Sequence, residues 1–180
     1  MNQINSPHDS VFRTLFETMG DPCFLCKKNG FIVDCNRAAW QILGYPDKQV
    51  VIGCSPEEIS PPFQPDGSAS HEKIIQMVEL ASTIGAHHFE WTHLHADGTS
   101  ILVEVMLTRI VMDGEEMLHS LWRDLTNRKQ AENALRKSET KLRLLFESTS
   151  DAVMLYDFKG FFDCNKAALE IFGCSTAETI

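Results

Sequence analysis

The chain contains one short segment twice. Residues 31–39 have the sequence FIVDCNRAA, and residues 161–168 have the sequence FFDCNKAA. Leu15–Phe16–Glu17 likewise returns as Leu145–Phe146–Glu147. Because similarity at a fixed spacing marks a repeated structural unit, the 180 residues predict one complete unit of about 125 residues and the first part of a second. We therefore expect the chain to be a piece of a longer modular protein.

The composition is typical of a soluble globular protein, with 43% hydrophobic and 23% charged residues. The net charge of −9 and the lack of a basic stripe argue against a nucleic-acid surface. No run approaches the roughly 18 apolar residues that cross a bilayer, so no membrane segment is expected. The six cysteines lack the spacing of a disulfide framework, which predicts reduced thiols and a cytoplasmic location.

Hydrophobic periodicity and turn residues predict the order of helices and strands. Asn29–Gly30 is typical of a hairpin turn, and Asn36 can cap a helix that follows it. The expected helices cover 8–19, 36–43, 70–84 and 127–147, and the expected strands cover 23–27, 31–35, 87–96, 99–111 and 116–125. This order predicts an α+β fold, in which one five-stranded antiparallel sheet carries helices on one face, with an N-terminal amphipathic helix and a long C-terminal helix.

The repeat and the helix pattern divide the chain into four segments. They are an N-terminal cap helix over 1–20, a first domain over 21–126, a linker helix over 127–147 and an incomplete second domain over 148–180. Two strands and one helix cannot bury a core by themselves. We therefore expect the last segment to be disordered or to depend on a neighbour.

Three groups of residues carry a family signature. They are Asp34–Ala39 with Gly44–Tyr45, the loop Ser60–Gly67 with Phe89–Glu90–Trp91 and Asp97–Gly98, and finally Asp124–Leu125–Thr126–Asn127–Arg128. Together, in this order and partly repeated, they resemble a PAS domain of bacterial signalling proteins, with one full copy and the N-terminal part of a second. In that family the last group is the exit motif, where the final strand becomes the signalling helix.

The resemblance implies a sensory and dimerisation module in a multidomain bacterial signal-transduction protein. Such a module is not itself an enzyme; it relays a ligand, redox or partner signal through its exit helix to a downstream output domain in the same chain. The implied outputs are a histidine kinase of a two-component system or a cyclic-dinucleotide enzyme. The residues agree, since no glycine-rich phosphate loop and no catalytic triad in motif context is present, and we expect no catalytic residue. One alternative is a ligand-free dimerisation module, and another is a thiol-redox protein.

The exit motif supplies the expected signal relay, formed by Asp124, Thr126 and Arg128. Thr126 can serve as the N-cap of a helix that starts at Asn127. Asp124 lies within reach of a charge-assisted pair with Arg128, which would couple the sheet edge to the helix. The alternative is an ordinary cap with a solvated ion pair worth about 0–1 kcal/mol.

Cys23 and Cys26 form the C-x-x-C motif on which the thiol-redox alternative depends. Redox motifs of this kind stand at a helix start, where the thiol pKa is lowered. Here the two residues lie on a predicted strand, which separates their Cα atoms by about 10 Å. A disulfide needs a separation under about 7 Å, so a structural role is favoured.

Large aromatic side chains predict either a filled core or a pocket for a small metabolite or aromatic cofactor. The pocket candidates are Trp40, Phe63, Met77, Trp91, His93 and Trp122, with Trp91 and His93 as polar handles. His87, His88, His93 and His95 crowd one predicted strand, and no cysteine or carboxylate converges with them. We therefore expect no metal site, and a strand that faces solvent or a dimer partner.

No cofactor can be assigned from the residues. Light-sensing flavin relatives carry a reactive cysteine about where this chain has Pro56, so photo-adduct chemistry is not expected. Haem-binding relatives use a histidine on the longer helix, and here only His71, in its first turn, lies near, which disfavours haem. A small metabolite, or a flavin without photochemistry, is compatible with the sequence.

Apolar stripes at both ends of the first unit predict a homodimer. The dimerisation candidates are Leu15, Phe16, Met19, Leu135, Leu142 and Leu145. Ser138 and Arg128 also fall at core positions of the heptad, so a coiled coil would be weak. Weakness suits a switch, whose two states differ by a few kcal/mol. The alternative is a helix that only spaces two domains.

Overall fold

The computed structural model describes residues 7–112 and 114–174, so the predicted segment 148–180 is described up to Cys174. The chain forms two compact units, residues 1–126 and residues 127–180. The first unit contains α1 (Pro7–Thr18), β1 (Cys23–Lys27), β2 (Ile32–Cys35), α2 (Arg37–Ile42), the 3-10 helix η1 (Lys48–Val50), α3 (Ser70–Ile84), β3 (Ala86–Leu94), β4 (Ser100–Met112) and β5 (Glu115–Asp124). The second contains α4 (Thr126–Ser148), which begins at the last residue of the first unit, then β6 (Met154–Asp157), β7 (Gly160–Cys164) and α5 (Lys166–Phe172).

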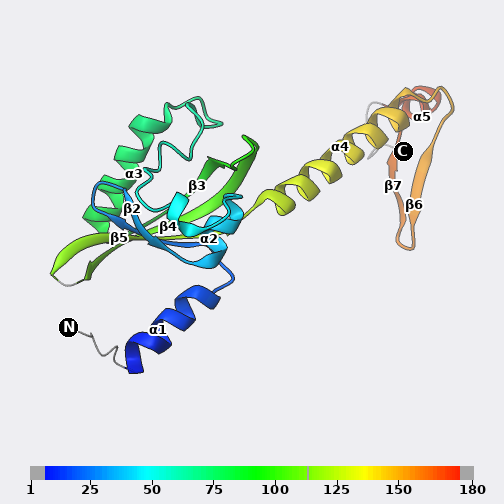
Figure 1. Ribbon diagram of the computed structural model, residues 1–180. Helices are drawn as coiled ribbons and strands as arrows, with labels where there is room; N and C mark the ends of the chain where they lie inside the picture. Colours follow the sequence, from blue (N-terminus) through cyan, green and yellow to red (C-terminus); the bar gives the residue numbers. More distant parts are fainter. Residues whose placement is uncertain (1–6, 113, 175–180) are drawn as a thin grey trace, which may run out of the picture. The chain divides into compact units, whose positions relative to one another are not determined.

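The first unit is built on a five-stranded antiparallel sheet in the order β2-β1-β5-β4-β3 (Figure 1). The last strand of this sheet, β5, lies at its centre, where it pairs with the opening strand β1 on one side and with β4 on the other. The register sets Cys23 opposite Leu121. The predicted fold class, an α+β fold around one antiparallel sheet, is therefore confirmed.

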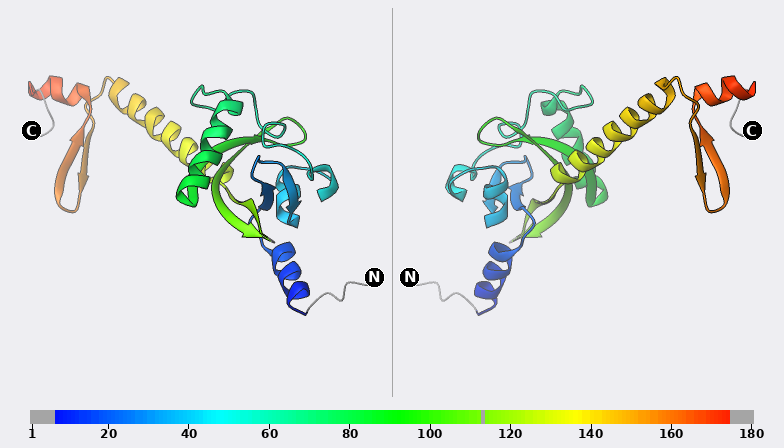
Figure 2. Two further views of the ribbon diagram at one scale, coloured as in Figure 1. Left: turned by 90° about the vertical axis from the view of Figure 1, so that its left-hand side faces the viewer. Right: turned by 90° about the vertical axis from the view of Figure 1, so that its right-hand side faces the viewer.

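The sheet curves around a core that α3 covers from one side (Figure 2). Alternation along β5 directs Leu118, Ser120 and Trp122 inward, where each is buried. On α3, residues three and four apart share one face, which places Ile74, Met77 and Val78 against the same core. The inner face of β5 and the inner face of α3 therefore face each other across the core.

Asn36 fixes the link between the first hairpin and α2. Its side chain is fully buried at 0% exposure, and its Oδ1 accepts hydrogen bonds from the backbone N–H groups of Cys23 and Ala39, both at 3.0 Å. Its Nδ2 donates to the carbonyl of Asp21 at 2.9 Å. One amide thus caps a helix and satisfies the backbone groups that precede β1, as a buried polar side chain must.

The second unit repeats the beginning of this arrangement. β6 and β7 form a two-stranded antiparallel sheet, and Asn165 caps α5. These residues adopt regular structure, and their dependence on a neighbour, the other outcome that we expect, stays a prediction. Their hydrophobic core is nevertheless small: in the described part, the buried residues of this unit are Cys164, Asn165 and Ala168.

Within residues 7–112 and 114–174, no helix is both long enough and apolar enough to span a membrane.

Candidate functional site: a cavity between the sheet and α3

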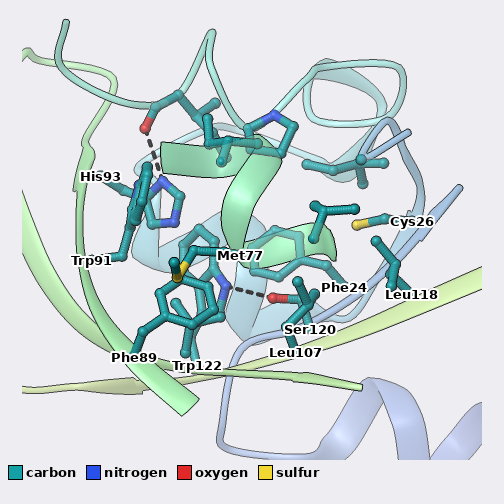
Figure 3. Close-up of a pocket in the computed structure, with 17 residues that line it drawn as sticks. Phe24, Cys26, Met77, Phe89, Trp91, His93, Leu107, Leu118, Ser120 and Trp122 are labelled. Carbon is teal, nitrogen blue, oxygen red and sulfur yellow. Dashed lines mark hydrogen bonds between the residues drawn. The ribbon is translucent and has the colours of Figure 1, made fainter. Parts of the chain in front are cut away.

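A cavity of about 70 Å³ lies in the first unit between the sheet and α3 (Figure 3). Its wall is mostly apolar. It is lined by Phe24 and Cys26 from β1, Ile74, Met77 and Val78 from α3, Phe89, Trp91 and His93 from β3, Val105 and Leu107 from β4, and Leu118, Ser120 and Trp122 from β5, and is completed by Gly30, Ile32, Pro56 and Ile59. An apolar wall with a few polar groups is the usual make-up of a small-molecule site.

His93 is the imidazole of this cavity and is only 4% exposed. Its ring stacks on Trp122, with the ring centroids 3.9 Å apart and 13° between the planes. Its Nδ1 lies 3.1 Å from the carbonyl oxygen of Ile59 and 3.2 Å from Oγ of Ser60. Burial lowers the pKa of His93 to about 3, so the ring is neutral near pH 7.

Two buried polar side chains fasten the loop beside the cavity to β3. Gln64 pairs with the backbone of Thr92: its Oε1 accepts from the N–H at 2.9 Å, and its Nε2 donates to the carbonyl at 3.2 Å. Ser60 Oγ accepts from Nε1 of Trp91 at 2.9 Å and donates to the carbonyl of Pro56 at 2.6 Å. These bonds satisfy the buried polar atoms and fix the Trp91 ring in the wall.

Four of the six predicted pocket residues line the cavity, namely Met77, Trp91, His93 and Trp122. The prediction is wrong for Phe63, whose side chain is 64% exposed in the loop, where its backbone pairs with Ala69. It is also wrong for Trp40, because α2 presents Ala39 to the core and Trp40 packs beside it, away from the cavity wall.

The expected solvated histidine strand is also wrong for His93, which is buried in the core. His93 lies two residues after Trp91 on β3, so the two side chains point to the same, inward face of the strand. The same rule could have identified Phe89 on β3 and Ser120 on β5, which sequence analysis missed. Ser120 Oγ accepts a hydrogen bond from Nε1 of Trp122 at 2.9 Å, so it also orients that ring.

Cys23 and Cys26 point to opposite faces of β1. Cys26 lines the cavity, whereas Sγ of Cys23 lies 2.9 Å from Nε2 of His119 on β5. Both thiols are free, and burial raises the pKa of Cys23 to about 11 and the pKa of Cys26 to about 12. A thiol-redox centre needs a lowered thiol pKa, so the structure contradicts the thiol-redox alternative.

The cavity volume limits the size of a ligand. A cavity of about 150 Å³ holds one benzene molecule, so a cavity of about 70 Å³ holds about three non-hydrogen atoms. A flavin or a haem is several times larger. His71, the nearest candidate for a haem ligand, is exposed on α3 and is paired with Glu57 at 3.1 Å. The residues of this cavity therefore fit a small molecule and not a large planar cofactor.

β5 runs from the cavity wall directly to α4. Two residues after Trp122, Asp124 Oδ1 accepts a hydrogen bond from the backbone N–H of Thr126 at 2.8 Å. The predicted N-cap at Thr126 is wrong: α4 begins at this residue, and its Oγ1 is buried with no hydrogen-bond partner in the described part of the chain. Arg128 Nε bonds to Glu132 Oε1 at 2.9 Å, and a pair between Arg128 and Asp124 stays a prediction.

Most of the predicted dimerisation residues are exposed. The exposed ones are Leu15 and Met19 near α1, and Leu135, Leu142 and Leu145 on α4, while Phe16 is half-buried. Sequence analysis missed Val11, Phe12 and Leu144, which are also exposed on these two helices. Both helices thus carry apolar side chains that no other described residue covers.

Comparison with known proteins identifies the family. A PAS domain family model matches residues 20–127, and a second PAS domain model matches residues 140–180. The first match covers more than half of the 180 residues, and the chain belongs to the PAS domain family. The predicted family is confirmed. A PAS domain is a sensory module that is not itself catalytic.

Solved PAS domains share this fold. The PAS domain of an HTR-like protein from Haloarcula marismortui is 28% identical with a TM-score of 0.55, and the match covers 65% of this chain and 91% of that one. A PAS domain from Colwellia psychrerythraea has a TM-score of 0.57 at 22% identity and covers 66% of this chain and 97% of that one. The second likeness concerns the fold alone.

Of two curated relatives, one is a sensor and the other is a kinase. The methyl sulfide methyltransferase-associated sensor of Methanosarcina acetivorans is 29% identical over 76% of this chain, and sporulation kinase A of Bacillus subtilis is 26% identical over 97%. The chain spans only 13% and 29% of the lengths of these two proteins. It is thus similar to parts of two larger proteins.

Proposed function

We propose that the first unit senses a small molecule in its cavity and relays the state of the cavity through β5 into α4. The observation that carries this proposal is the continuity of β5. Ser120 and Trp122 line the cavity, and Asp124, on the same strand, accepts a hydrogen bond from the first backbone N–H of α4. A strand that pairs on both sides moves as one element, so a displacement at Trp122 has a short path to the helix.

The relay works through packing and one hydrogen bond. An occupant that contacts Trp122 or Ser120 shifts the backbone of β5 by a small amount. The bond between Asp124 and Thr126 then changes the geometry of the first turn of α4, where the helix has no intrahelical partner for its amides. In this proposal α4 leads to an output domain of a longer cytoplasmic bacterial signalling protein, a histidine kinase or a cyclic-dinucleotide enzyme. The likeness to sporulation kinase A favours the kinase.

Amide hydrogen exchange of α4 tests the relay. Met77→Phe fills part of the cavity from α3, and Gln76→Phe places the same ring on the solvent-exposed side of that helix. We expect Met77→Phe to change exchange over residues 126–132, and Gln76→Phe to leave it as in the unmodified chain. Equal exchange over residues 126–132 in all three proteins would contradict the relay.

We propose homodimerisation as a second function, which the exposed leucines of α4 favour. Leu135 and Leu142 are 61% and 64% exposed and lie seven residues apart, as core positions of a parallel coiled coil do. We expect Leu142→Lys to shift the chain from dimer to monomer in analytical ultracentrifugation. Thr140→Lys, on the opposite side of the helix, should leave the dimer intact. A monomer in the unmodified chain at every concentration would rule out this second function.

A further inference from the structure

We propose that the cavity binds a small neutral molecule carrying a hydroxyl group, and that this hydroxyl donates a hydrogen bond to Nε2 of His93. This inference rests on the proposed sensory function and specifies the chemistry of its ligand. It depends on which ring nitrogen of His93 carries the proton, on what surrounds the other nitrogen and on the size of the cavity.

The neighbours of Nδ1 determine where the proton sits. The carbonyl of Ile59, 3.1 Å away, can only accept a hydrogen bond. The hydroxyl of Ser60 has one hydrogen and gives it to the carbonyl of Pro56 at 2.6 Å, so it also acts as an acceptor toward the ring. Nδ1 must therefore be the N–H. In a neutral imidazole the other nitrogen, Nε2, is then a hydrogen-bond acceptor.

Nε2 has no hydrogen-bond partner among residues 7–112 and 114–174, although His93 is 4% exposed. Figure 3 shows this nitrogen on the side of the ring away from the dashed bond to Ile59, turned toward the other side chains of the cavity. Buried acceptors are nearly always hydrogen-bonded, by protein, water or ligand. The cavity thus presents an acceptor that an occupant can satisfy.

A second polar group of the cavity makes a hydroxyl the best match. Ser120 Oγ accepts from Trp122, and in the described part of the chain its own hydrogen has no hydrogen-bond acceptor. The cavity therefore offers one acceptor at His93 and one donor at Ser120. A hydroxyl can donate to the first or accept from the second, whereas a carbonyl can use only Ser120 and an ammonium only His93.

The remaining wall excludes charge and large size. Side chains such as Ile74, Phe89 and Leu107 give an apolar surface on which an ion would lose its hydration. Burial holds His93 neutral, with a pKa of about 3, so the ring offers no charge to an anion. The volume admits about three non-hydrogen atoms. Small alcohols such as ethanol meet all three conditions.

Ethanol and propane form a matched pair of probes, because they have the same number of non-hydrogen atoms and differ in a hydroxyl against a methyl. In titrations of the 180-residue chain followed by NMR, we expect ethanol to bind at least tenfold more tightly than propane. The ¹⁵N signal of His93 Nε2 should have the shift of an unprotonated nitrogen and should move with ethanol only. Equal affinity for the two probes, no binding of either, or a protonated Nε2 would each overturn the inference.

His93→Phe separates the hydrogen bond from packing. The ring that stacks on Trp122 is kept, and the carbonyl of Ile59 still accepts from the N–H of Leu94 at 2.8 Å, so the variant has no orphaned group there. We expect the tenfold preference for ethanol over propane to be lost in this variant and kept in His88→Phe, a change at an exposed position of β3. The hydrogen-exchange test with Met77→Phe uses no ligand, so it reports on the relay alone. The titrations report on the ligand, and the two proposals can therefore fail separately.

Discussion

In both units an asparagine at the start of the helix after the first hairpin forms hydrogen bonds to the segment before that hairpin. Asn36 in the first and Asn165 in the second donate to the carbonyls of Asp21 and Asp151 at 2.9 and 2.8 Å. Each also accepts a hydrogen bond from a backbone N–H at the start of the first hairpin, from Cys23 at 3.0 Å and from Val153 at 2.9 Å. The comparison teaches that this device is local: it forms in the second unit without strands equivalent to β3, β4 and β5 in the described residues.

An ion pair is repeated along with the amide. Arg13 of α1 binds Asp34 at 2.6 Å, and Arg143 of α4 binds Asp163 at 3.2 Å. α4 therefore has the place in the second unit that α1 has in the first. Because α4 also follows β5 directly, one helix is at once the exit of the sensory unit and an integral part of the next unit.

The cavity lies in the first unit. Its wall needs α3 and the three strands that follow, which supply Met77, Trp91 and Trp122 and have no equivalents in the described part of the second unit. The repeat thus supplies the connection, and the rest of the domain supplies the proposed sensing site.

The largest expected difference concerns the two asparagines. Asn36→Ala removes a helix cap and leaves the buried N–H of Cys23 and the carbonyl of Asp21 without this partner, which should lower the free energy of unfolding by about 3 kcal/mol. Asn165→Ala should leave the first unit unchanged. Tryptophan fluorescence during urea unfolding reports the first unit alone, since all three tryptophans lie there. Equal loss from both variants would show that the two units unfold together.

Acid should destabilise the first unit through His93. Burial lowers the pKa of His93 in the folded state to about 3, from an ordinary histidine value of about 6.5, so as pH falls the ring takes up its proton in the unfolded chain before it does so in the folded one. The stability that the neutral ring contributes is complete above about pH 6.5 and is lost below it, by about 2 kcal/mol between pH 7 and pH 5. In urea titrations across this range, His93→Phe should flatten the slope. An unchanged slope would mean that His93 is not the group responsible.

Gly44 and Gly173 end equivalent helices with positive φ angles of 72° and 65°. Alanine at either site should cost about 1–2 kcal/mol for the left-handed backbone. Only at Gly44 would the added Cβ overlap the imidazole of His95, so Gly44→Ala should cost more. His95→Ala should restore part of the loss. Thermal unfolding of the first-unit variants and amide exchange of α5 measure the two effects, and equal costs would contradict the contact with His95.

The smallest expected difference concerns the two ion pairs. Asp34 is joined by Lys48 as well as Arg13, and the hydrogen bonds of these two cations hold its pKa below the usual value despite burial. Asp34→Asn should therefore cost up to about 1 kcal/mol, more than Asp163→Asn, and the cost should shrink in high salt. Urea unfolding at low and high salt measures it for Asp34, and exchange of the β7 amides for Asp163. A salt-independent cost would argue for packing instead of charge.

The sequence predicted the framework well because local signals determine it. The repeat around Asn36 and Asn165, the turn at Asn29–Gly30 and the alternation along β4 each act over a few residues, and they led to the sheet and its helices. The cavity depends on which face each strand turns inward, and this is set by contacts between distant segments. Phe63 was placed wrongly for that reason: its aromatic character predicted burial, while the loop directs it to solvent.

The sequence was least informative about polar groups whose partners lie far along the chain. Ser60 meets Trp91 and His93 through a hydrogen-bond network that spans more than thirty positions. Thr126 is a residue type that often caps helices. Here Asp124 instead accepts the hydrogen bond from the first backbone N–H of α4, because the helix begins one residue earlier than predicted. Such choices depend on tertiary geometry, which residue type alone does not determine.

The central claim is that the state of the cavity reaches the second unit through α4. The most direct measurement is the exchange rate of the Val153 amide, which donates to Asn165 at 2.9 Å, in the unmodified chain and in Met77→Phe. The account predicts that filling the cavity changes exchange at Thr126 and, more weakly, at Val153, with Gln76→Phe having no effect. A change confined to residues 7–124, with Thr126 and Val153 unaltered, would contradict it.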